Sequence, residues 1–204
     1  MGFQVFEEPF TEPAAHPENY KDYECAFAAD CIRNLHPKRI LDIGSYRLFI
    51  VGLLSEFQVT TVDVRKRRPA SRNETVVTCD AKSLDLPNDT FDLVLSLCSL
   101  EHFGLGRYGD EFDPEADGKA FEEMIRVLKV GGHLVFSTTI TNAKPNIAFN
   151  AHRIYSYEMI HQFCDGLTNI DEKFYSHKIG GWCKLDEITR EAMVWDVYCG
   201  CWRK

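Results

Sequence analysis

The hydrophobic residues follow two spacings along the chain, and their alternation predicts strands that alternate with helices. Apolar runs of five to eight residues have the length and composition of buried strands; they lie at 39–43, 58–63, 75–79, 91–98 and 133–139. Between several of these runs, apolar residues recur three and four positions apart, which is typical of one buried helix face. These helical segments cover 19–35, about 46–56 and 113–129.

Proline, glycine and serine mark the expected ends of the helices. Pro37 follows the first helix, and Pro114 suits the start of the third. Gly131 and Gly132 would stop that third helix. Ser156 begins a shorter helix, whose inner face would be formed by Tyr157, Ile160 and Phe163.

The order of these elements predicts an α/β protein with a doubly wound, mostly parallel sheet and right-handed crossovers. The tail offers two further strands, near 168–176 and 191–201, with no helix between them. We therefore expect these two strands to pair as an antiparallel hairpin at the C-terminal edge of the sheet. A length of 204 residues suits a single core of this kind.

The chain is expected to consist of an N-terminal attachment and one compact domain. Residues 1–18 are rich in proline and glutamate, which predicts an extended arm. We expect residues 1–37 to form this arm and a helix packed on the core, and residues 38–204 to form the domain itself. No repeat, low-complexity segment or linker divides the domain.

Composition narrows the choice of partners and compartment. A net charge of −8 argues against a general binder of nucleic acid or of an anionic membrane surface, since both need a basic face. The first 30 residues hold no apolar signal core, and no apolar run reaches the roughly 20 residues of a membrane span, so a cytoplasmic protein is expected. None of the eight cysteines forms a Cys-x-x-Cys pair, which favours buried reduced thiols over zinc ligands or disulfides.

Two carboxylates mark the expected ligand edge of the sheet. Asp42 lies in the strand at 39–43, and Asp63 ends the strand at 58–63. Because the carboxyl ends of parallel strands meet at one edge, both would lie where open α/β sheets bind nucleoside-bearing ligands. A carboxylate there suits a ribose, since an ionised acid can accept hydrogen bonds from both hydroxyls of the diol.

Several short motifs between residues 38 and 139 coincide with predicted strand ends. They are Leu41-Asp42-Ile43-Gly44, Asp63, Cys79-Asp80-Ala81, Asp89-Thr90-Phe91-Asp92-Leu93-Val94 and Val127-Leu128-Lys129-Val130-Gly131-Gly132. Together they resemble the motifs of class I S-adenosylmethionine-dependent methyltransferases. The resemblance implies a Rossmann-like sheet of the class I methyltransferase type.

Two further stretches, Gly104-Leu105-Gly106-Arg107-Tyr108-Gly109-Asp110 and Phe149-Asn150-Ala151-His152-Arg153-Ile154-Tyr155, extend this resemblance beyond the fifth strand. They are similar to a methyltransferase-like family known as a domain of unknown function. That narrower resemblance supplies no substrate.

The resemblance implies a site for S-adenosylmethionine over the ends of the first three strands. The turn after the first strand would hold the methionine portion, the acid at the end of the second strand the ribose, and the pair after the third strand the adenine. Glycine in the first turn permits close backbone approach. The predicted cofactor-binding residues are Asp42, Gly44, Ser45, Asp63, Val64, Asp80, Ala81 and Leu97.

The first turn departs from the family pattern at two positions. Methyltransferases of this type usually have glycines two and four residues after the first one, and Tyr46 and Leu48 stand there instead. Either the turn is wider than usual or these side chains block the pocket. The Gly-x-Gly-x-x-Gly pattern of a nicotinamide dinucleotide site is also absent.

Histidines supply the candidates for proton transfer. Methyl transfer needs alignment above all, and a hydroxyl acceptor also needs a base, for which the ordinary pKa of histidine is suitable. Glu101-His102 follows the fourth strand, and His152 follows the fifth; His102 and His152 are the predicted catalytic residues. A metal site of Glu101, His102 and Asp110 meets no specific ligand spacing, so no metal is expected.

Two segments are expected to cover the acceptor. The stretch 104–118 is long, glycine-rich and acidic, and loops of that length are usually functional; a plain surface loop that caps the next helix is the alternative. The stretch 149–155 lies at the same edge, where a network at the start of the next helix would also explain its polar residues. The predicted substrate-binding residues are Arg107, Tyr108, Asp110, Arg153 and Tyr155.

Two other features are assigned less specific roles. The cations at 65–68 follow Asp63 and could attract an anion, although charge runs in loops are usually solvated. Trp182, Trp195 and Trp202 fall in the edge hairpin, where core packing or a homodimer contact is favoured over base stacking.

These observations lead to one functional expectation and two competitors. We expect an S-adenosylmethionine-dependent methyltransferase that acts on a small polar molecule at oxygen. The alternative is a methyltransferase-like protein that does not catalyse and serves as a binding or scaffold module, as Tyr46 and Leu48 would favour. A nucleotide-binding enzyme of another type would need a phosphate-binding loop, and the sequence has none.

Overall fold

The computed structural model describes residues 18–204, so the expected extended arm lies almost wholly outside the described residues. Its elements in chain order are α1 (Tyr20–Leu35), β1 (Arg39–Ile43), α2 (Arg47–Leu53), β2 (Gln58–Asp63), β3 (Glu74–Thr78), β4 (Phe91–Leu97), the 3-10 helix η1 (Leu100–His102), α3 (Ala116–Val127), β5 (Leu128–Ile140), β6 (Asn146–Ala148), β7 (His152–Ile154), α4 (Tyr157–Phe163), β8 (Thr168–Ser176), β9 (Gly181–Cys183), the 3-10 helix η2 (Leu185–Glu187) and β10 (Asp196–Arg203).

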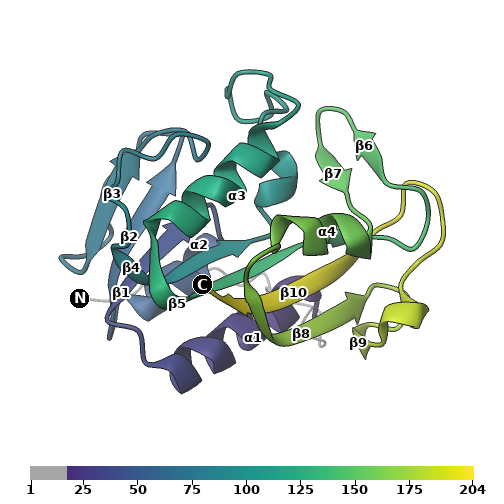
Figure 1. Cartoon of the computed structure of the whole chain (residues 1–204), viewed down its shortest axis with the longest axis horizontal. Coiled ribbons are helices and arrows are strands. Elements are labelled where there is room, and N and C mark those ends of the chain that lie inside the picture. Colours follow the sequence, from purple (N-terminus) through teal and green to yellow (C-terminus); the bar gives the residue numbers. More distant parts are fainter. Residues whose placement is uncertain (1–17) are drawn as a thin grey trace, which may run out of the picture.

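An eight-stranded sheet in the order β3-β2-β1-β4-β5-β10-β8-β9 forms the centre of the structure (Figure 1). The five strands from β3 to β5 are parallel, whereas β10 runs antiparallel to both β5 and β8. This confirms the predicted α/β class, the mostly parallel sheet and the antiparallel C-terminal edge. The carboxyl ends of β1, β2, β3 and β4 consequently lie at one edge, where Asp63 ends β2.

Helices cover both faces of the sheet because its strands are apolar on both sides. On one face, Phe121 and Met124 of α3 and Ile160 of α4 pack against Leu41 and Phe136. Figure 1 shows α3 and α4 on this side and α1 on the opposite side. The sheet is therefore doubly wound, as the continuous apolar runs predicted.

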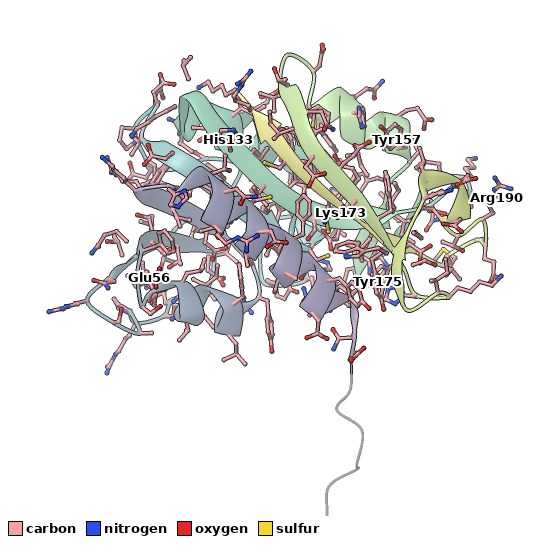
Figure 2. The ribbon with its side chains drawn as sticks, turned by 90° about the horizontal axis from the view of Figure 1, so that it is seen from below. Glu56, His133, Tyr157, Lys173, Tyr175 and Arg190 are labelled. Atoms are coloured by element: carbon pink, nitrogen blue, oxygen red, sulfur yellow. The ribbon has the colours of Figure 1, made fainter. Side chains whose placement is uncertain are left out.

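The second face is covered by α1 and α2. Phe27 and Ile32 of α1 and Ile50 of α2 pack against strand residues such as Ile40 and Leu95. Asn19 begins α1 with a capping box, in which its side chain accepts from the Lys21 N–H and the Asp22 carboxylate accepts from the Asn19 N–H. Figure 2 shows this face, with Lys173 and Tyr175 of β8 beside α1.

The structure corrects several predicted boundaries. Strand β5 begins at Leu128, so Gly131 and Gly132 lie inside the strand instead of stopping a helix. The last strand begins at Asp196 and not near 191, because the preceding residues form a turn in which Met193 has a φ of 65°. Strands β6 and β7 form a hairpin, and β9 adds an outer strand; neither was predicted.

The states of the cysteines and the character of the helices bear on covalent cross-links and on membrane spans. All eight cysteines are free thiols, four of them buried. Among residues 18–204, no helix has both the length and the apolar character needed to cross a membrane.

Candidate functional site

A cleft lies at the carboxyl ends of β1 to β4, below the loop that precedes α3. Its empty space, open solvent included, is about 630 Å³. The cleft is lined by Ile43, Gly44, Val62, Asp63, Val64, Arg65, Cys79, Asp80, Ala81, Cys98, Ser99, His102, Phe103, Gly104, Tyr108 and Asp110.

The turn after β1 is built so that its backbone approaches the cleft. Gly44 has a φ of 73°, and a Cβ at this position would lie only 3.0 Å from the Ser99 Cβ. The hydroxyl of Ser99 donates to the Ile43 carbonyl at 2.8 Å and so holds the turn against the end of β4. A glycine is required here by both the backbone conformation and the space.

Asp42 and Ser45 support this turn from beneath. Asp42 is buried, and its carboxylate accepts from the Ser45 N–H at 3.2 Å. Burial raises the pKa of Asp42 to about 6. The Ser45 hydroxyl accepts from the N–H of Leu97, which joins the turn to β4. Asp42, Ser45 and Leu97, all predicted cofactor ligands, thus shape the wall of the cleft without lining it.

Tyr46 and Leu48 do not obstruct the cleft. Their exposed fractions are 43% and 67%, and neither residue lines the cavity. Tyr46 occupies the N-cap of α2, and Leu48 lies in the first turn of that helix. The side chains that replace the usual glycines are therefore solvent-exposed and do not line the cleft.

Asp63 carries the main charge of the cleft, and Arg65 already neutralises it. The Arg65 guanidinium donates to both carboxylate oxygens, with Nε 2.9 Å from Oδ1 and Nη2 2.7 Å from Oδ2. Burial alone would raise the pKa of Asp63, but these bonds outweigh it and hold the pKa below its ordinary value. The same guanidinium lies over the Tyr108 ring, 4.8 Å from its centroid.

Asp80, Ala81 and Val64, which are also predicted to bind the cofactor, line the cleft. Asp80 accepts from the Lys82 N–H at 3.0 Å, which leaves its other carboxylate oxygen open to a ligand apart from Lys82 Nζ at 3.6 Å. Ala81 is buried beside it, and Val64 is partly exposed across the cleft.

The cationic run at 65–68 divides into residues with different partners. Arg67, together with Arg47 of α2, donates to the buried Glu74 carboxylate at the start of β3. Lys66 and Arg68 are exposed, and among residues 18–204 they form no ion pair. The run therefore serves mainly to hold the β2–β3 connection, with Arg65 facing the cleft.

His102 ends η1 at the floor of the cleft. Its Nδ1 lies 2.6 Å from the Ala151 carbonyl oxygen, and because a carbonyl can only accept, Nδ1 carries the proton and donates. Burial, with the nearby charges of Arg107 and His152, lowers the pKa of His102 to about 4. The ring is therefore neutral near pH 7, with Nε2 unprotonated.

Two buried carboxylates lie beneath His102. Glu101 accepts from the Thr138 hydroxyl at 3.1 Å, and its other oxygen is 3.9 Å from His102 Nε2. Burial, reinforced by the nearby Glu24, raises the pKa of Glu101 to about 7. Glu24 of α1 is paired with Lys21 at 2.7 Å and accepts from the Ser137 hydroxyl.

A row of aromatic and histidine rings continues from His102 along the same edge. His152 of β7 lies 6.3 Å from His102 between ring centroids, and Trp195 lies 5.8 Å from His152. Tyr20 of α1 and His177 complete the row, 5.4 Å and 4.6 Å from Trp195. Burial lowers the pKa of His152. Tyr20, Glu24 and His177 were not predicted at this edge, because their partners are distant in sequence.

The β6–β7 hairpin is tied to the loop before α3. Arg153 is buried, and its guanidinium donates to the carbonyls of Phe103 and Pro114 and lies 3.4 Å from the Asp117 carboxylate. The buried Tyr155 hydroxyl donates to the same carboxylate at 2.9 Å. Figure 1 shows the hairpin and the loop rising at the same end of the sheet.

The remaining predicted substrate residues lie in the loop itself. Asp110 accepts from the N–H groups of Gly106 and Tyr108 and so closes a tight turn. Tyr108 and Asp110 line the cleft, whereas the Arg107 guanidinium donates to the Ala151 carbonyl at 2.9 Å. Within residues 18–204, no three His, Cys, Asp or Glu side chains lie close enough together to hold a metal ion.

Comparison with known proteins places the chain in a family. The model of the family DUF268, described as a "Caenorhabditis protein of unknown function", matches residues 60–186, and the chain belongs to this family. Both motif stretches that suggested such a family, 104–110 and 149–155, fall inside the match. No curated protein matches the sequence significantly.

Solved structures define the fold more broadly. The N-methyltransferase NodS from Bradyrhizobium japonicum WM9, in complex with S-adenosyl-L-homocysteine, is 16% identical with a TM-score of 0.63, covering 90% of this chain and 86% of that one. The 1,6-didemethyltoxoflavin-N1-methyltransferase of Burkholderia thailandensis, with bound 1,6-didemethyltoxoflavin and S-adenosylhomocysteine, is 17% identical with a TM-score of 0.61, covering 96% and 93%.

A third structure shows that this fold is not confined to methyl transfer. The [4+2]-cyclase SpnF is 18% identical with a TM-score of 0.63, covering 88% of this chain and 81% of that one. These likenesses show that the chain has the class I methyltransferase fold. They do not by themselves assign its reaction.

Proposed function

We propose that this protein is an S-adenosylmethionine-dependent methyltransferase that acts on a small polar molecule. The observation that carries the proposal is the cleft at the carboxyl ends of β1 to β4, which is lined by both the left-handed Gly44 and Asp63. An open backbone turn beside an acid at the end of the second strand fits a nucleoside with an attached amino acid. Two of the similar structures hold S-adenosylhomocysteine.

The cofactor would lie along the strand ends. Asp63 would accept hydrogen bonds from the ribose hydroxyls, Asp80 and Ala81 would contact the adenine, and the backbone at Gly44 would contact the methionine portion. Bound S-adenosylmethionine supplies a methyl group activated by a sulfonium. Asp42, Ser45 and Leu97 would hold the shape of the turn.

The acceptor would lie beside His102, between the cleft and the row of rings. A hydroxyl acceptor must lose a proton as its oxygen attacks, and the unprotonated Nε2 of His102, a residue that lines the cleft, would take it. The hydrogen bond from Nδ1 to Ala151 fixes the orientation of that ring. His152, in ring contact with His102, is the second candidate base.

The predicted acceptor-binding residues then divide into two groups. Tyr108 and Asp110 line the cleft and would contact the acceptor or the cofactor directly. The second group forms hydrogen bonds between the loop and the hairpin; it consists of Arg107, Arg153 and Tyr155. We assign these residues to hold the two segments together above the site.

Calorimetric titration with S-adenosylhomocysteine tests the proposal. The wild-type chain should bind it, and Asp63→Asn should bind at least about tenfold more weakly, because a charged acceptor for the diol is worth about 1.5–3 kcal/mol. Asp30→Asn is the matched control, since Asp30 is an exposed acid on α1. Equal affinity in wild type and Asp63→Asn would contradict the assigned ribose site.

The competing proposal is a binding or scaffold protein without catalysis. Its main support was the pair Tyr46 and Leu48, which do not line the cleft. Absence of any heat or thermal shift at millimolar S-adenosylhomocysteine and S-adenosylmethionine would favour it, because a ligand at ~100 times its dissociation constant should add ~2.7 kcal/mol of stability.

A further inference from the structure

Arg65 is paired with Asp63, the acid that the proposed function assigns to the ribose. Its guanidinium and backbone N–H together give the Asp63 carboxylate three hydrogen bonds, and both oxygens are used. A ribose diol would need those same two oxygens. Three of the roughly four acceptor positions of the carboxylate are thus taken, so a diol can bind both oxygens fully only when the Arg65 side chain moves away.

The same side chain also holds the loop above the cleft. The Arg65 guanidinium stacks on Tyr108, whose N–H is bound by Asp110 in the tight turn of the loop. Asp63, Arg65, Tyr108 and Asp110 all line the cleft. One cation thus joins the end of β2 to the loop across the mouth of the site.

The contact is suited to reversible opening. The Arg65 side chain is 61% exposed and that of Asp63 is 15% exposed, so water can solvate the guanidinium once it leaves. The pair lies at the surface on the arginine side, and ion pairs near the surface contribute little net stability. Asp63 is only two residues away, so the arginine returns to it as an intramolecular competitor whose effective concentration is high.

We propose that Arg65 is a displaceable latch, which closes the ribose-binding acid and holds the Tyr108 loop over the cleft until the cofactor displaces it. This inference rests on the proposed function, because it takes the ligand to be an adenosine derivative with a free diol. Cofactor binding and release of the Tyr108 loop are then coupled, and each favours the other.

Titration of S-adenosylhomocysteine into wild type, Arg65→Ala and Arg68→Ala tests the latch. Arg65→Ala should bind about two- to fivefold more tightly than wild type, the range that release of an exposed ion pair allows. Arg68→Ala removes a charge from the same segment but leaves Asp63 paired, and its affinity should match wild type. Arg65→Lys, which keeps a charge but not the two-pronged geometry, should lie between wild type and Arg65→Ala.

Ionic strength provides a second, independent readout on the same proteins. Between about 0.02 M and about 0.5 M sodium chloride, screening weakens the Arg65–Asp63 pair, so wild-type affinity should rise towards that of Arg65→Ala. The affinity of Arg65→Ala should change little. This reversed salt dependence is not expected if Arg65 merely stabilises the fold.

The outcomes separate the latch from the function on which it rests. Equal or weaker binding by Arg65→Ala, with wild type still binding, would overturn the latch and leave the cofactor site standing. Loss of binding in wild type and in every variant would overturn the proposed function, and the latch with it. Tighter binding by Arg65→Ala, with the salt effect confined to proteins that keep a cation at position 65, would establish both.

Discussion

Substitution of Glu101 by glutamine tests the buried charge beneath the cleft. Glu101 is buried, with Glu24 nearby, and its pKa rises from an ordinary 4.5 to about 7 in the folded chain. A carboxyl with a raised pKa binds its proton more tightly when folded. Wild-type stability should therefore fall as the pH rises through the window between 4.5 and about 7, and level off above it.

The size of the effect follows from these two values. A pKa shift of this size changes the free energy of unfolding by about 3 kcal/mol over the whole titration. About 2.5 kcal/mol of that change falls between about pH 5 and pH 8. Glutamine cannot ionise, yet its amide oxygen can still accept from the Thr138 hydroxyl. Relative to wild type, Glu101→Gln should thus gain about 2.5 kcal/mol between these two pH values.

Urea denaturation at pH 5 and pH 8 measures this difference directly. At each pH, the free energy of unfolding of wild type is subtracted from that of the variant. The prediction concerns how this difference changes between pH 5 and pH 8. Glu122→Gln is the control, because Glu122 is exposed on α3 and its substitution should leave the pH dependence unaltered. A difference between Glu101→Gln and wild type that stays constant from pH 5 to pH 8 would refute the reasoning.

Three further substitutions test how the site is held, each by urea denaturation. Glu74→Gln should lower the free energy of unfolding by about 3 kcal/mol at pH 7, because two arginines lose their buried partner. Hydrogen bonds hold the pKa of Glu74 well below its ordinary value, so this loss of stability should shrink as the pH falls below about 4. Gly104→Ala places a Cβ 2.2 Å from the Asp113 carbonyl oxygen at a φ of 69°, and should cost at least about 1–3 kcal/mol; unchanged stability would contradict the observed path of the loop. Tyr155→Phe removes the hydroxyl that donates to the Asp117 carboxylate at 2.9 Å and leaves only the Arg153 guanidinium at 3.4 Å, for an expected loss of about 1–3 kcal/mol in the free energy of unfolding.

The fold could be predicted from the sequence where local pattern and long-range structure agree. The strands at 39–43 and 58–63 were predicted with the bounds that the structure shows, because each is a short apolar run between clear boundaries. The β6–β7 hairpin was missed because strands of three residues show no measurable period. The start of β5 was missed because Gly131 and Gly132 are usual helix stops but lie here within a strand.

The site was predictable in position but not in its contacts. The strand-end rule placed Asp63 and Asp80 on the cleft, since it depends only on strand order. The partnership of Glu24 with Ser137 spans 113 residues, and no local spacing indicates it. Arg153 was expected to bind substrate because it is polar and lies at the ligand edge, whereas the structure gives its guanidinium backbone partners inside the protein.

Whether the cleft can bind a ligand depends on whether the side chains that obstruct it are fixed or can move. Tyr46 and Leu48 would have been fixed obstructions, because a side chain in place of a turn glycine cannot be displaced without remodelling the backbone. Both are solvent-exposed and do not line the cleft, and the group that is paired with Asp63 is the long, exposed side chain of Arg65. Rotation of that side chain removes both guanidinium bonds to Asp63 with the backbone unchanged, and leaves only the Arg65 N–H on Oδ1. The closed cleft is therefore compatible with a binding site that a ligand must open for itself.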